Sequence, residues 1–551
     1  MGSIKGKLQS GALNVALNFL AVVAFATLAL SQQRIAGYAL TGVTLVAIFL
    51  RSNNLRTTVS AQILLTAGLL LDYERHVDDR VALTIVGVLL ALLIINMPFV
   101  ETVVRRPIIQ VANLPGYEAD HGLLISPNVL YLANPVWIAI LGVFAAAKLT
   151  AWPLIIPVAV GAAAVVTVSM QALQARLRGT QTEKRLRDAL IQHGATFALY
   201  FTAPDETEYH IEMWRPYLER LGKPWMIVLR EGRPFEEVAA AAAPGGIPVL
   251  YCPLIKHVDD VVTPSLKTVF YVNNGAKNAH MVRFSRMTHI QLLHGDSDKQ
   301  SSFNPVTAMY NRIFVAGQAG IDRYEANGVL IPRLKFEIVG RPQLETIKVS
   351  HTHIRDVTDK IVLYATTWAS PFEDMSYSSL RISEKIVRKL LERKVTIILR
   401  PHPYTRNDIA SARYLTRLHQ ILAEDRDKTG RAHVFGAAAT KEMSVNDCAN
   451  AADAMISDVS AVASDFLYSS KPFAMTSMNG GSPEEFVASF PLGSAAYIID
   501  KTGSNLDVVL DKLLEDDPLE ETRHEVKRHY LGDFSEDAYA DGFVKAAAAH
   551  V

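Results

Sequence analysis

The sequence predicts a two-part protein, in which an all-α transmembrane bundle of about six helices precedes an α/β half made of two Rossmann-like domains. The first observation is an uneven charge distribution: residues 1–170 hold 17 charged residues, and the other 381 hold 93. The second is a series of six apolar runs in the first part. The third is that, from Ala195, apolar runs of strand length alternate with polar helical stretches, which is typical of a doubly wound parallel sheet.

The overall composition excludes several classes of protein. A chain of 551 residues that is 50% hydrophobic is not disordered. Its 55 Lys and Arg balance its 55 Asp and Glu, so we expect no nucleic acid partner. The two cysteines, Cys252 and Cys448, lack a CxxC spacing and a nearby histidine cluster. This pattern indicates a reducing compartment and no structural metal site.

The six apolar runs are candidate membrane spans. Four of them approach the roughly 20 residues that cross a bilayer, whereas the second has 16 residues and the third only 13, a length equally typical of a re-entrant segment. The runs contain almost no ionisable residues, which disfavours a transporter and favours an anchor. They cover residues 11–30, 35–50, 59–71, 81–100, 129–147 and 152–170.

Basic residues near the ends of the runs decide between five and six spans, because Lys and Arg of short loops stay on the cytoplasmic side. Six spans with the N-terminus inside place 11 basic residues inside and 4 outside; without the third run the division is 7 against 8. The sequence therefore predicts a multi-pass protein of the cell membrane with a cytoplasmic second half. The inner set is Lys5, Lys7, Arg51, Arg56, Arg105, Arg106, Arg176, Arg178, Lys184, Arg185 and Arg187, and the outer set is Arg34, Arg75, Arg80 and Lys148.

Four regions follow from these patterns. Residues 1–170 form the helical domain, and 171–194 form a basic amphipathic linker helix, which is either a positive-inside stop or a contact for anionic lipid phosphates. Residues 195–341 form the first Rossmann-like domain, and 342–551 form the second with C-terminal helices. We expect the first group of strands at 196–201, 225–229, 248–252, 268–272, 289–293 and 312–315, and the second at 336–339, 361–365, 395–399, 433–435, 454–457, 472–476 and 496–499.

Residues directly after these strands are the candidate site residues, because an open α/β sheet binds its ligand at the carboxyl ends of its strands. Helix N-termini at the same edge present free N–H groups to phosphate. Two histidines, an arginine and a Ser/Asp turn at this edge could surround a nucleotide diphosphate and the hydroxyl that attacks it. The residues that follow the strands are His294-Gly295, Gly340-Arg341-Pro342, Thr366-Thr367-Trp368, Arg400-Pro401-His402-Pro403 and Ser457-Asp458-Val459-Ser460.

Six segments together resemble a known family. They are THIQLLHGDSDK (288–299), FVAGQAGIDRY (314–324), VGRPQLE (339–345), LYATTW (363–368), ILRPHP (398–403) and ISDVSAVASDFLYSSKP (456–472). Over roughly residues 200–540 the chain is similar to the CDP-glycerol glycerophosphotransferases, the teichoic acid polymerases and primases.

The resemblance implies a GT-B-like fold, with the acceptor side in the first Rossmann-like domain and the CDP-donor side in the second. It also implies transfer of glycerol phosphate or ribitol phosphate from a CDP-alditol to a hydroxyl of a lipid-linked or cell-wall polymer, with release of CMP. The CDP-alditol is a substrate, so no cofactor is expected. Membrane lipids would be further partners.

By position, the resemblance assigns His294 as the catalytic base. It places His402 opposite, beside Arg400, as a second catalytic residue that hydrogen-bonds the pyrophosphate or a developing charge. A neutral imidazole that accepts the proton of an attacking hydroxyl suits this chemistry, and a guanidinium holds phosphate oxygens bidentately. Ser457, Asp458 and Ser460 are expected to cap a helix whose N–H groups meet a phosphate. Asp465 would face the ribose or make a surface pair, and Lys299 would meet phosphate or solvent. Gly295 and Thr367 complete the expected donor site.

The chain departs from the family pattern at several positions. Asp296 and Asp298 add negative charge beside the expected base, where they could raise the pKa of His294 or bind a cation. Two other functions remain open: a GT-B glycosyltransferase or epimerase that uses a UDP-sugar, and a non-catalytic membrane scaffold with a degenerate nucleotide cleft. The acceptor, the choice of alditol, the number of additions and the oligomeric state also stay open. The remaining departures are Leu293, Gln343, Glu345, Thr366, Ala369, Val459 and Ala461.

Overall fold

The computed structural model of the chain consists of two compact units. It describes residues 2–31, 33–50, 58–104, 108–118, 127–203, 207–369 and 377–551. The first unit comprises Met1–Ile108 and Tyr117–Asp188, and the second comprises Ile109–Gly116 and Ala189–Val551. A short segment between two helices of the first unit therefore belongs to the second unit.

The first unit is helical. The connections that follow its first, third and fifth helices lie at the same end of the unit. There Arg34 hydrogen-bonds to Asp72 and to the carbonyl of Ala145. The Tyr73 hydroxyl donates to the carbonyl of Leu149 at 2.6 Å. Successive helices therefore run up and down. They are α1 (Gly2–Ala29), α2 (Arg34–Leu50), α3 (Val59–Glu74), α4 (Arg80–Val104), α5 (Pro127–Ala146) and α6 (Trp152–His193).

The prediction of six membrane spans is not confirmed. Among the described residues, one stretch, Trp152–Gln171, is long and apolar enough to cross a membrane. The other apolar stretches have 10–17 residues, and 17 helical residues cover only about 26 Å of a hydrocarbon core of about 30 Å. These shorter stretches are Leu13–Ala29, Arg34–Leu50, Arg80–Asn96 and Ala133–Ala146.

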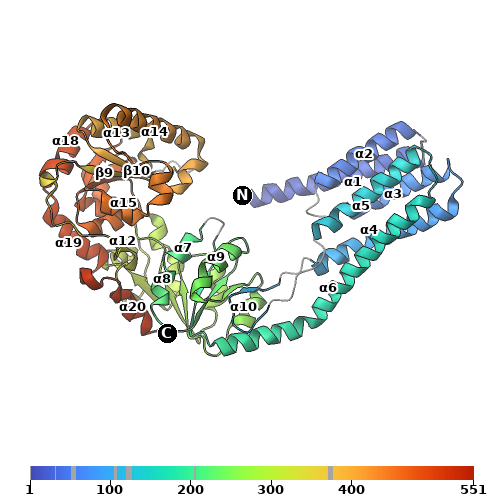
Figure 1. Cartoon of the computed structure of the whole chain (residues 1–551), viewed down its shortest axis with the longest axis horizontal. Helices are drawn as coiled ribbons and strands as arrows, with labels where there is room; N and C mark the ends of the chain where they lie inside the picture. The colour runs from blue at the N-terminus through green and yellow to red at the C-terminus, as the bar shows by residue number, and fades with distance from the viewer. Residues whose placement is uncertain are drawn as a thin grey trace. The chain divides into compact units, whose positions relative to one another are not determined.

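The predicted linker helix is not a separate element. Residues 171–193 continue α6 without a break, so the candidate span and the basic stretch share one helix of 42 residues (Figure 1). Of the basic residues expected on the inner side, Arg51, Arg56, Arg105 and Arg106 lie outside the described residues.

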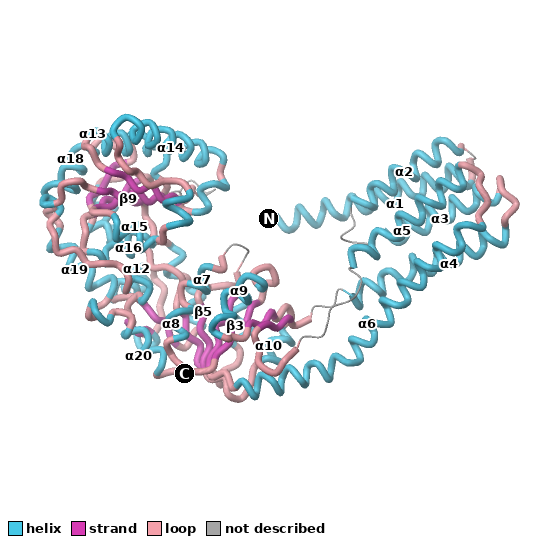
Figure 2. The backbone as a smooth tube through the Cα atoms, viewed as in Figure 1, coloured by secondary structure: helices cyan, strands magenta, loops and turns pink. Residues whose placement is uncertain are grey.

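The first sheet of the second unit has eight strands in the order β1-β4-β3-β2-β5-β6-β7-β8. Figure 2 draws the strands in magenta and labels β3 and β5 of this sheet. All neighbouring pairs are parallel except β1 with β4. The buried strands are apolar on both faces, as a sheet covered by helices on both sides requires. The strands are β1 (Gln110–Ala112), β2 (Phe197–Phe201), β3 (Trp225–Leu229), β4 (Val249–Tyr251), β5 (Thr268–Tyr271), β6 (Thr288–Gln291), β7 (Arg312–Val315) and β8 (Phe336–Ile338).

The edge strand β1 was not predicted. It lies in the sequence between α4 and α5, and it pairs antiparallel with β4, with Gln110 opposite Tyr251 and Ala112 opposite Val249. Beside it, the Asn113 amide donates to the carbonyl of Ala239 at 2.8 Å. A strand of three residues carries too little alternation to be recognised from sequence.

The second sheet has five parallel strands in the order β10-β9-β11-β12-β13. Two expected strands differ from the prediction: residues 336–339 form the edge of the first sheet, and 433–435 make a single bridge between Val434 and Ile398. The expected α/β class is confirmed. The strands are β9 (Ile361–Thr366), β10 (Thr396–Pro401), β11 (Ala454–Ser457), β12 (Phe473–Ser477) and β13 (Tyr497–Asp500).

Helices cover both sheets, and the last one returns to the first sheet. Phe543 and Ala547 of α20 are buried in the same core as Phe197 and Trp214, whereas the sequence had placed the C-terminal helices with the second sheet. The helices of this unit are α7 (Tyr209–Glu212), α8 (Arg215–Glu219), α9 (Phe235–Ala242), α10 (Ile255–Val261), α11 (Ala279–Val282), α12 (Gln318–Ala326), α13 (Ser383–Glu392), α14 (Ile409–Thr429), α15 (Val445–Ala451), α16 (Ala461–Phe466), α17 (Pro483–Ser489), α18 (Leu506–Asp511), α19 (Glu520–Leu531) and α20 (Asp541–Ala548).

Candidate active site

The predicted site residues of the second sheet lie side by side. Thr367, His402 and Asp458 each follow one of the adjacent strands β9, β10 and β11. The strand register places these three residues at about the same height along the strands, because Pro401 pairs with Thr366 and Ser457 pairs with Ala365. The carboxyl edge of this sheet therefore presents three polar side chains together, as expected for a ligand site.

Residues that follow β6 in the first sheet reach this edge. The Lys299 ammonium donates to the Thr367 hydroxyl at 3.1 Å. A Cβ on Gly295 would lie 3.3 Å from the Cβ of Ala461, so glycine allows the loop at residues 292–299, here called the histidine loop, to approach the start of α16 closely. Burial lowers the pKa of Lys299, and an anion bound there would counter this effect. Lys299 is thus a cation placed where the two sheets meet.

His294 is held in one tautomer. Its Nδ1 lies 3.1 Å from the carbonyl of Val272, and a carbonyl only accepts hydrogen bonds, so Nδ1 carries the proton and Nε2 keeps its lone pair. The side chain is exposed on one side, while the surrounding protein excludes water from the rest of the ring. This burial is the main cause that lowers the pKa of His294, and Arg341 contributes. At neutral pH His294 is therefore an uncharged base.

The carboxylates expected beside His294 serve another residue. Arg323 forms ion pairs with both Asp296 and Asp298, at 3.0 Å to Asp298. The second oxygen of Asp298 accepts from the Tyr530 hydroxyl at 3.0 Å and from the Leu492 N–H at 3.1 Å. The prediction that these carboxylates could raise the pKa of His294 was wrong, because Arg323 neutralises them and burial lowers that pKa.

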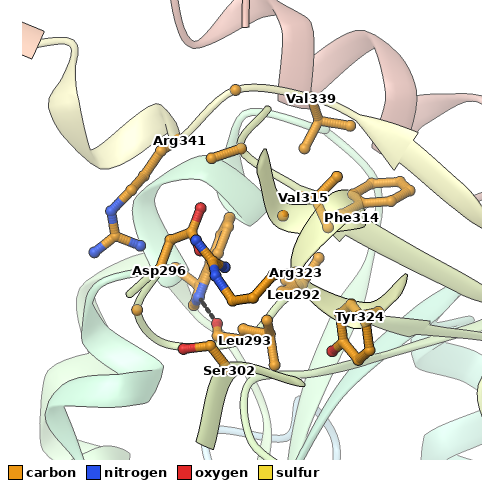
Figure 3. Close-up of a pocket in the computed structure, with 15 residues that line it drawn as sticks. Leu292, Leu293, Asp296, Ser302, Phe314, Val315, Arg323, Tyr324, Val339 and Arg341 are labelled. Carbon is orange, nitrogen blue, oxygen red and sulfur yellow. Dashed lines mark hydrogen bonds and ion pairs between the residues drawn. The ribbon is translucent and has the colours of Figure 1, made fainter. Parts of the chain in front are cut away.

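A small pocket lies behind the histidine loop (Figure 3). Asp296 and Arg323 lie next to one another in it, and one oxygen of the buried Asp296 carboxylate has no hydrogen-bond partner. The opposite wall is apolar. It includes Leu292, Phe314, Val315 and Val339.

Leu293, which precedes the histidine, has a left-handed backbone with φ of 57°. Two side chains hold this conformation: Gln291 Oε1 accepts the Leu293 N–H at 3.0 Å, and Trp214 Nε1 donates to the Leu293 carbonyl at 2.7 Å. Left-handed backbone costs a residue with a Cβ about 1–2 kcal/mol. The surrounding contacts maintain this strain next to His294, as is common at functional sites.

His402 has the opposite tautomer. Its Nδ1 accepts the N–H of Tyr404 at 3.1 Å, so in the neutral ring the proton lies on Nε2. Burial, with a contribution from Lys299, lowers the pKa of His402 to about 4. The ring is therefore a neutral hydrogen-bond donor near the cationic Lys299.

Asp458 is an anchor for the loops around the site. One oxygen accepts from the Thr367 N–H at 2.7 Å; the other accepts from the Ser379 N–H at 3.1 Å and from the Thr476 hydroxyl at 2.7 Å. Burial raises the pKa of its carboxyl, and these donors oppose that rise. With both oxygens occupied, Asp458 positions Thr367, and its predicted part in the donor site stays a prediction.

The expected caps of α16 are absent. Ser460 occupies the N-cap position, but its side chain makes no capping hydrogen bond. The hydroxyls of Ser457 and Ser460 lie 3.2 Å apart, and Ser457 donates to the carbonyl of Ala365 at 3.0 Å. Phosphate contact by these two serines stays a prediction.

Two other predicted residues make internal contacts. Asp465 forms a buried bidentate pair with Arg341, at 2.5 Å to Nε and 3.1 Å to Nη2, instead of the surface pair considered from sequence. Arg400 donates from Nη1 to the carbonyls of Ala439 and Met443. Donor binding by Arg400 or Asp465 stays a prediction.

Sequence reasoning missed His210 in α7. Its ring stacks on that of His294, with centroids 3.9 Å apart and planes inclined by 17°. The next residue towards the N-terminus, Tyr209, packs its ring edge-on to His210 at 4.3 Å. His210 follows no strand and belongs to no motif, so the rule that located the other residues could not find it.

The comparison with protein families concerns the second sheet. Residues 345–479, which include Thr367, His402 and Asp458, match a family model described as CDP-Glycerol:Poly(glycerophosphate) glycerophosphotransferase. None of the curated proteins matches the sequence. The match supports the family resemblance over this part of the chain.

The solved structures that the chain is similar to are distant from it. The wall teichoic acid polymerase TagF is 13% identical, with a TM-score of 0.39, over 69% of this chain and 97% of that chain. A glycosyltransferase from Rickettsia africae is 12% identical, with a TM-score of 0.40, over 64% and 96%. A structure of Anabaena HepE in complex with UDP and glucose is 11% identical, with a TM-score of 0.38, over 64% and 99%.

Proposed function

We propose that the protein transfers an alditol phosphate from a CDP-alditol to a hydroxyl group of a lipid-linked or cell-wall polymer and releases CMP. The observation that carries the proposal is the arrangement of His294. Its protonated Nδ1 is bound to Val272, its Nε2 keeps a lone pair, and its side chain reaches solvent at the edge where the two sheets meet. The family match at residues 345–479 supports the glycerophosphotransferase type of activity.

His294 takes the acceptor proton. Its Nε2 removes the proton from the acceptor hydroxyl while the hydroxyl oxygen attacks the phosphorus of the alditol phosphate. The new P–O bond forms as the P–O bond to CMP breaks, and CMP leaves with the electron pair. General base catalysis of this kind contributes about 10²- to 10⁴-fold.

His402 and Lys299 interact with the donor phosphates. His402 carries its proton on Nε2, so it can donate to a phosphate oxygen whose charge increases as CMP leaves. Lys299 lies beside Thr367 and supplies positive charge to the pyrophosphate. The proposed donor site therefore binds the anion with one desolvated cation and neutral donors.

The first test is CMP release by the detergent-solubilised full chain. CDP-glycerol and CDP-ribitol are supplied separately with a membrane lipid extract as the source of acceptor. We expect His294→Asn to lower the rate at least about 100-fold and the exposed His524→Asn, a matched control, to leave it unchanged. Full activity of His294→Asn, or no CMP from either donor with folded protein, would contradict the proposal.

We further propose that the first unit anchors the protein in the cell membrane, with the site in the cytoplasm. Most of the large exposed apolar side chains of the described residues belong to this unit, including Val15, Ile35, Val81 and Ile156, which are 63–90% exposed. Apolar surface of this extent is costly in water and favourable in lipid. A membrane anchor would hold the site near a lipid-linked acceptor.

The edge strand β1 constrains how such an anchor crosses the membrane. The chain leaves the first sheet after β1, passes through α5 and α6, and returns to the same sheet at β2. A segment that starts and ends on one side of a membrane crosses it an even number of times. If the candidate span in α6 crosses the membrane, α5 must cross it as well.

A further inference from the structure

We propose that His210 is a positioning residue for His294, whose ring it holds in place through stacking. The inference rests on the proposed function, in which His294 is the base. The two rings are nearly parallel, with centroids 3.9 Å apart. The carbonyl of Val272 accepts a hydrogen bond within the plane of the His294 ring, and His210 packs on the face of that ring. Two contacts in perpendicular directions therefore fix the His294 ring.

His210 acts through its face and not through its nitrogens. Both ring nitrogens are buried and have no hydrogen-bond partner, and the residue is 5% exposed. A substrate cannot reach such atoms without displacing protein. Leaving a buried polar atom unpaired costs about 1–3 kcal/mol. The face of a planar ring parallel to His294 is the feature that the site uses, and a ring without nitrogens would supply the same face without this cost.

The enclosure of His210 also explains why it stays uncharged. Its ring is surrounded by Phe201, Tyr209 and His294, none of which is an anion. Burial and the neighbouring His294 lower the pKa of His210 to about 3. Arg341 is a charged group that acts on His294, and it lowers the pKa of His294. Arg341 is itself paired with Asp465.

The expected pH dependence follows from these contacts. A base whose pKa lies below the ordinary 6.5 stays unprotonated, and therefore active, to lower pH than an exposed histidine does. Removing the stacked ring hydrates that face of His294, which raises its pKa towards 6.5. The acid limb of the activity profile should then move to higher pH, and activity should fall at pH values where the wild type is still active.

Three variants of the full chain separate stacking from other roles. His210→Ala removes the ring, His210→Phe keeps an aromatic ring without nitrogens, and His524→Ala is the matched exposed control. We expect His210→Ala to lower kcat about 10- to 100-fold with an unchanged KM for the CDP-alditol, and to move the acid limb upwards by about half a pH unit or more. His210→Phe should stay within about threefold of the wild type.

A second measurement does not need turnover. Diethyl pyrocarbonate modifies only unprotonated imidazole, so the rate at which His294 is modified, followed by peptide mass spectrometry against pH, reports its pKa. We expect the midpoint of His294 to rise in His210→Ala and to stay near the wild-type value in His210→Phe and His524→Ala. This measurement remains informative if neither CDP-alditol proves to be a substrate.

Two outcomes would overturn the inference. The first is a wild-type midpoint and wild-type kcat in His210→Ala, which would leave His294 as the base without a positioning partner. The second is an equal loss in His210→Phe and His210→Ala with intact thermal unfolding, which would mean that the nitrogens matter. In both cases, loss of activity in His294→Asn would still support the proposed function, because that variant tests His294 independently of His210.

Discussion

Leu293 determines how His294 enters the site, because its left-handed backbone turns the chain directly after β6. Gln291 and Trp214 hold this turn through the two peptide groups around Leu293. A residue branched at Cβ has more steric conflict in this conformation than leucine, whereas asparagine tolerates it. The identity of the residue at position 293 therefore affects both stability and the placement of the base.

We predict that Leu293→Val destabilises the protein by about 1–2 kcal/mol more than Leu293→Asn does. Valine and asparagine are similar in size, so the pair isolates the backbone effect. Thermal unfolding of the full chain in detergent measures the difference, and CMP release should fall further for valine because His294 is displaced. Equal unfolding temperatures for the two variants would show that φ at Leu293 imposes no strain.

The residues that sequence reasoning located share one feature: they follow parallel strands. Thr367, His402 and Asp458 were found in this way, because adjacent parallel strands bring their carboxyl ends to one edge. His210 lies in a helix of four residues, and its role depends on a ring contact with a residue 84 positions away. The pairing of Asp298 with Arg323 and Tyr530 likewise joins distant segments that have no common pattern.

At the level of elements, the strands of the two sheets and their grouping were largely predictable, and the grouping failed for one strand and for the last helix. Apolar runs such as 225–229 and 312–315 coincide with β3 and β7 because strands buried on both faces are continuously apolar. The run at 336–339 pairs with β7, and α20 returns to the first sheet. Both assignments depend on tertiary contacts that a local pattern does not contain.

The edge strand β1 affects how the second unit behaves on its own. A fragment that starts at Ala189 lacks β1, which leaves one edge of β4 unpaired. Exposed strand edges promote association between chains. We predict that the fragment 189–551 aggregates more readily than the same fragment preceded by residues 108–117 on a flexible linker.

Size-exclusion chromatography and light scattering of the two fragments at equal concentration would measure this difference. A control fragment carries residues 108–117 with Val111 replaced by Asp, which keeps length and linker but places a charge in the strand. Equal monomer fractions for all three fragments would mean that β1 does not protect the edge of β4.

For the whole molecule, the decisive question is which segments cross a membrane together. Both native cysteines, Cys252 and Cys448, are buried, so a cysteine introduced at an exposed site should react with maleimide almost alone. Glu118 lies just after β1, and Lys148 lies between α5 and α6; both are exposed. If α5 and α6 form a membrane hairpin, these two positions lie on opposite sides of the membrane.

We predict that a membrane-impermeant maleimide added to intact cells labels Lys148→Cys and leaves Glu118→Cys unlabelled. Inverted vesicles should give the reverse result, because the proposed topology places the position after β1 in the cytoplasm together with the site. Permeabilised membranes, in which both variants should react, provide the control. Labelling of both positions from one side would exclude the membrane hairpin.

The position of β1 also sets an order of events while the chain is being synthesised. Gln110 and its partner Tyr251 are separated by about 140 residues, and between them the ribosome makes α5 and the whole of α6. At roughly 5–20 residues per second, β1 waits about 7 to 28 seconds for β4 to emerge. During this interval its N–H and C=O groups have no partner strand, and the helical hairpin must leave the translation machinery before the sheet can close. If the first unit is the proposed membrane anchor, its insertion and the completion of the first sheet are consecutive steps of one biogenesis pathway.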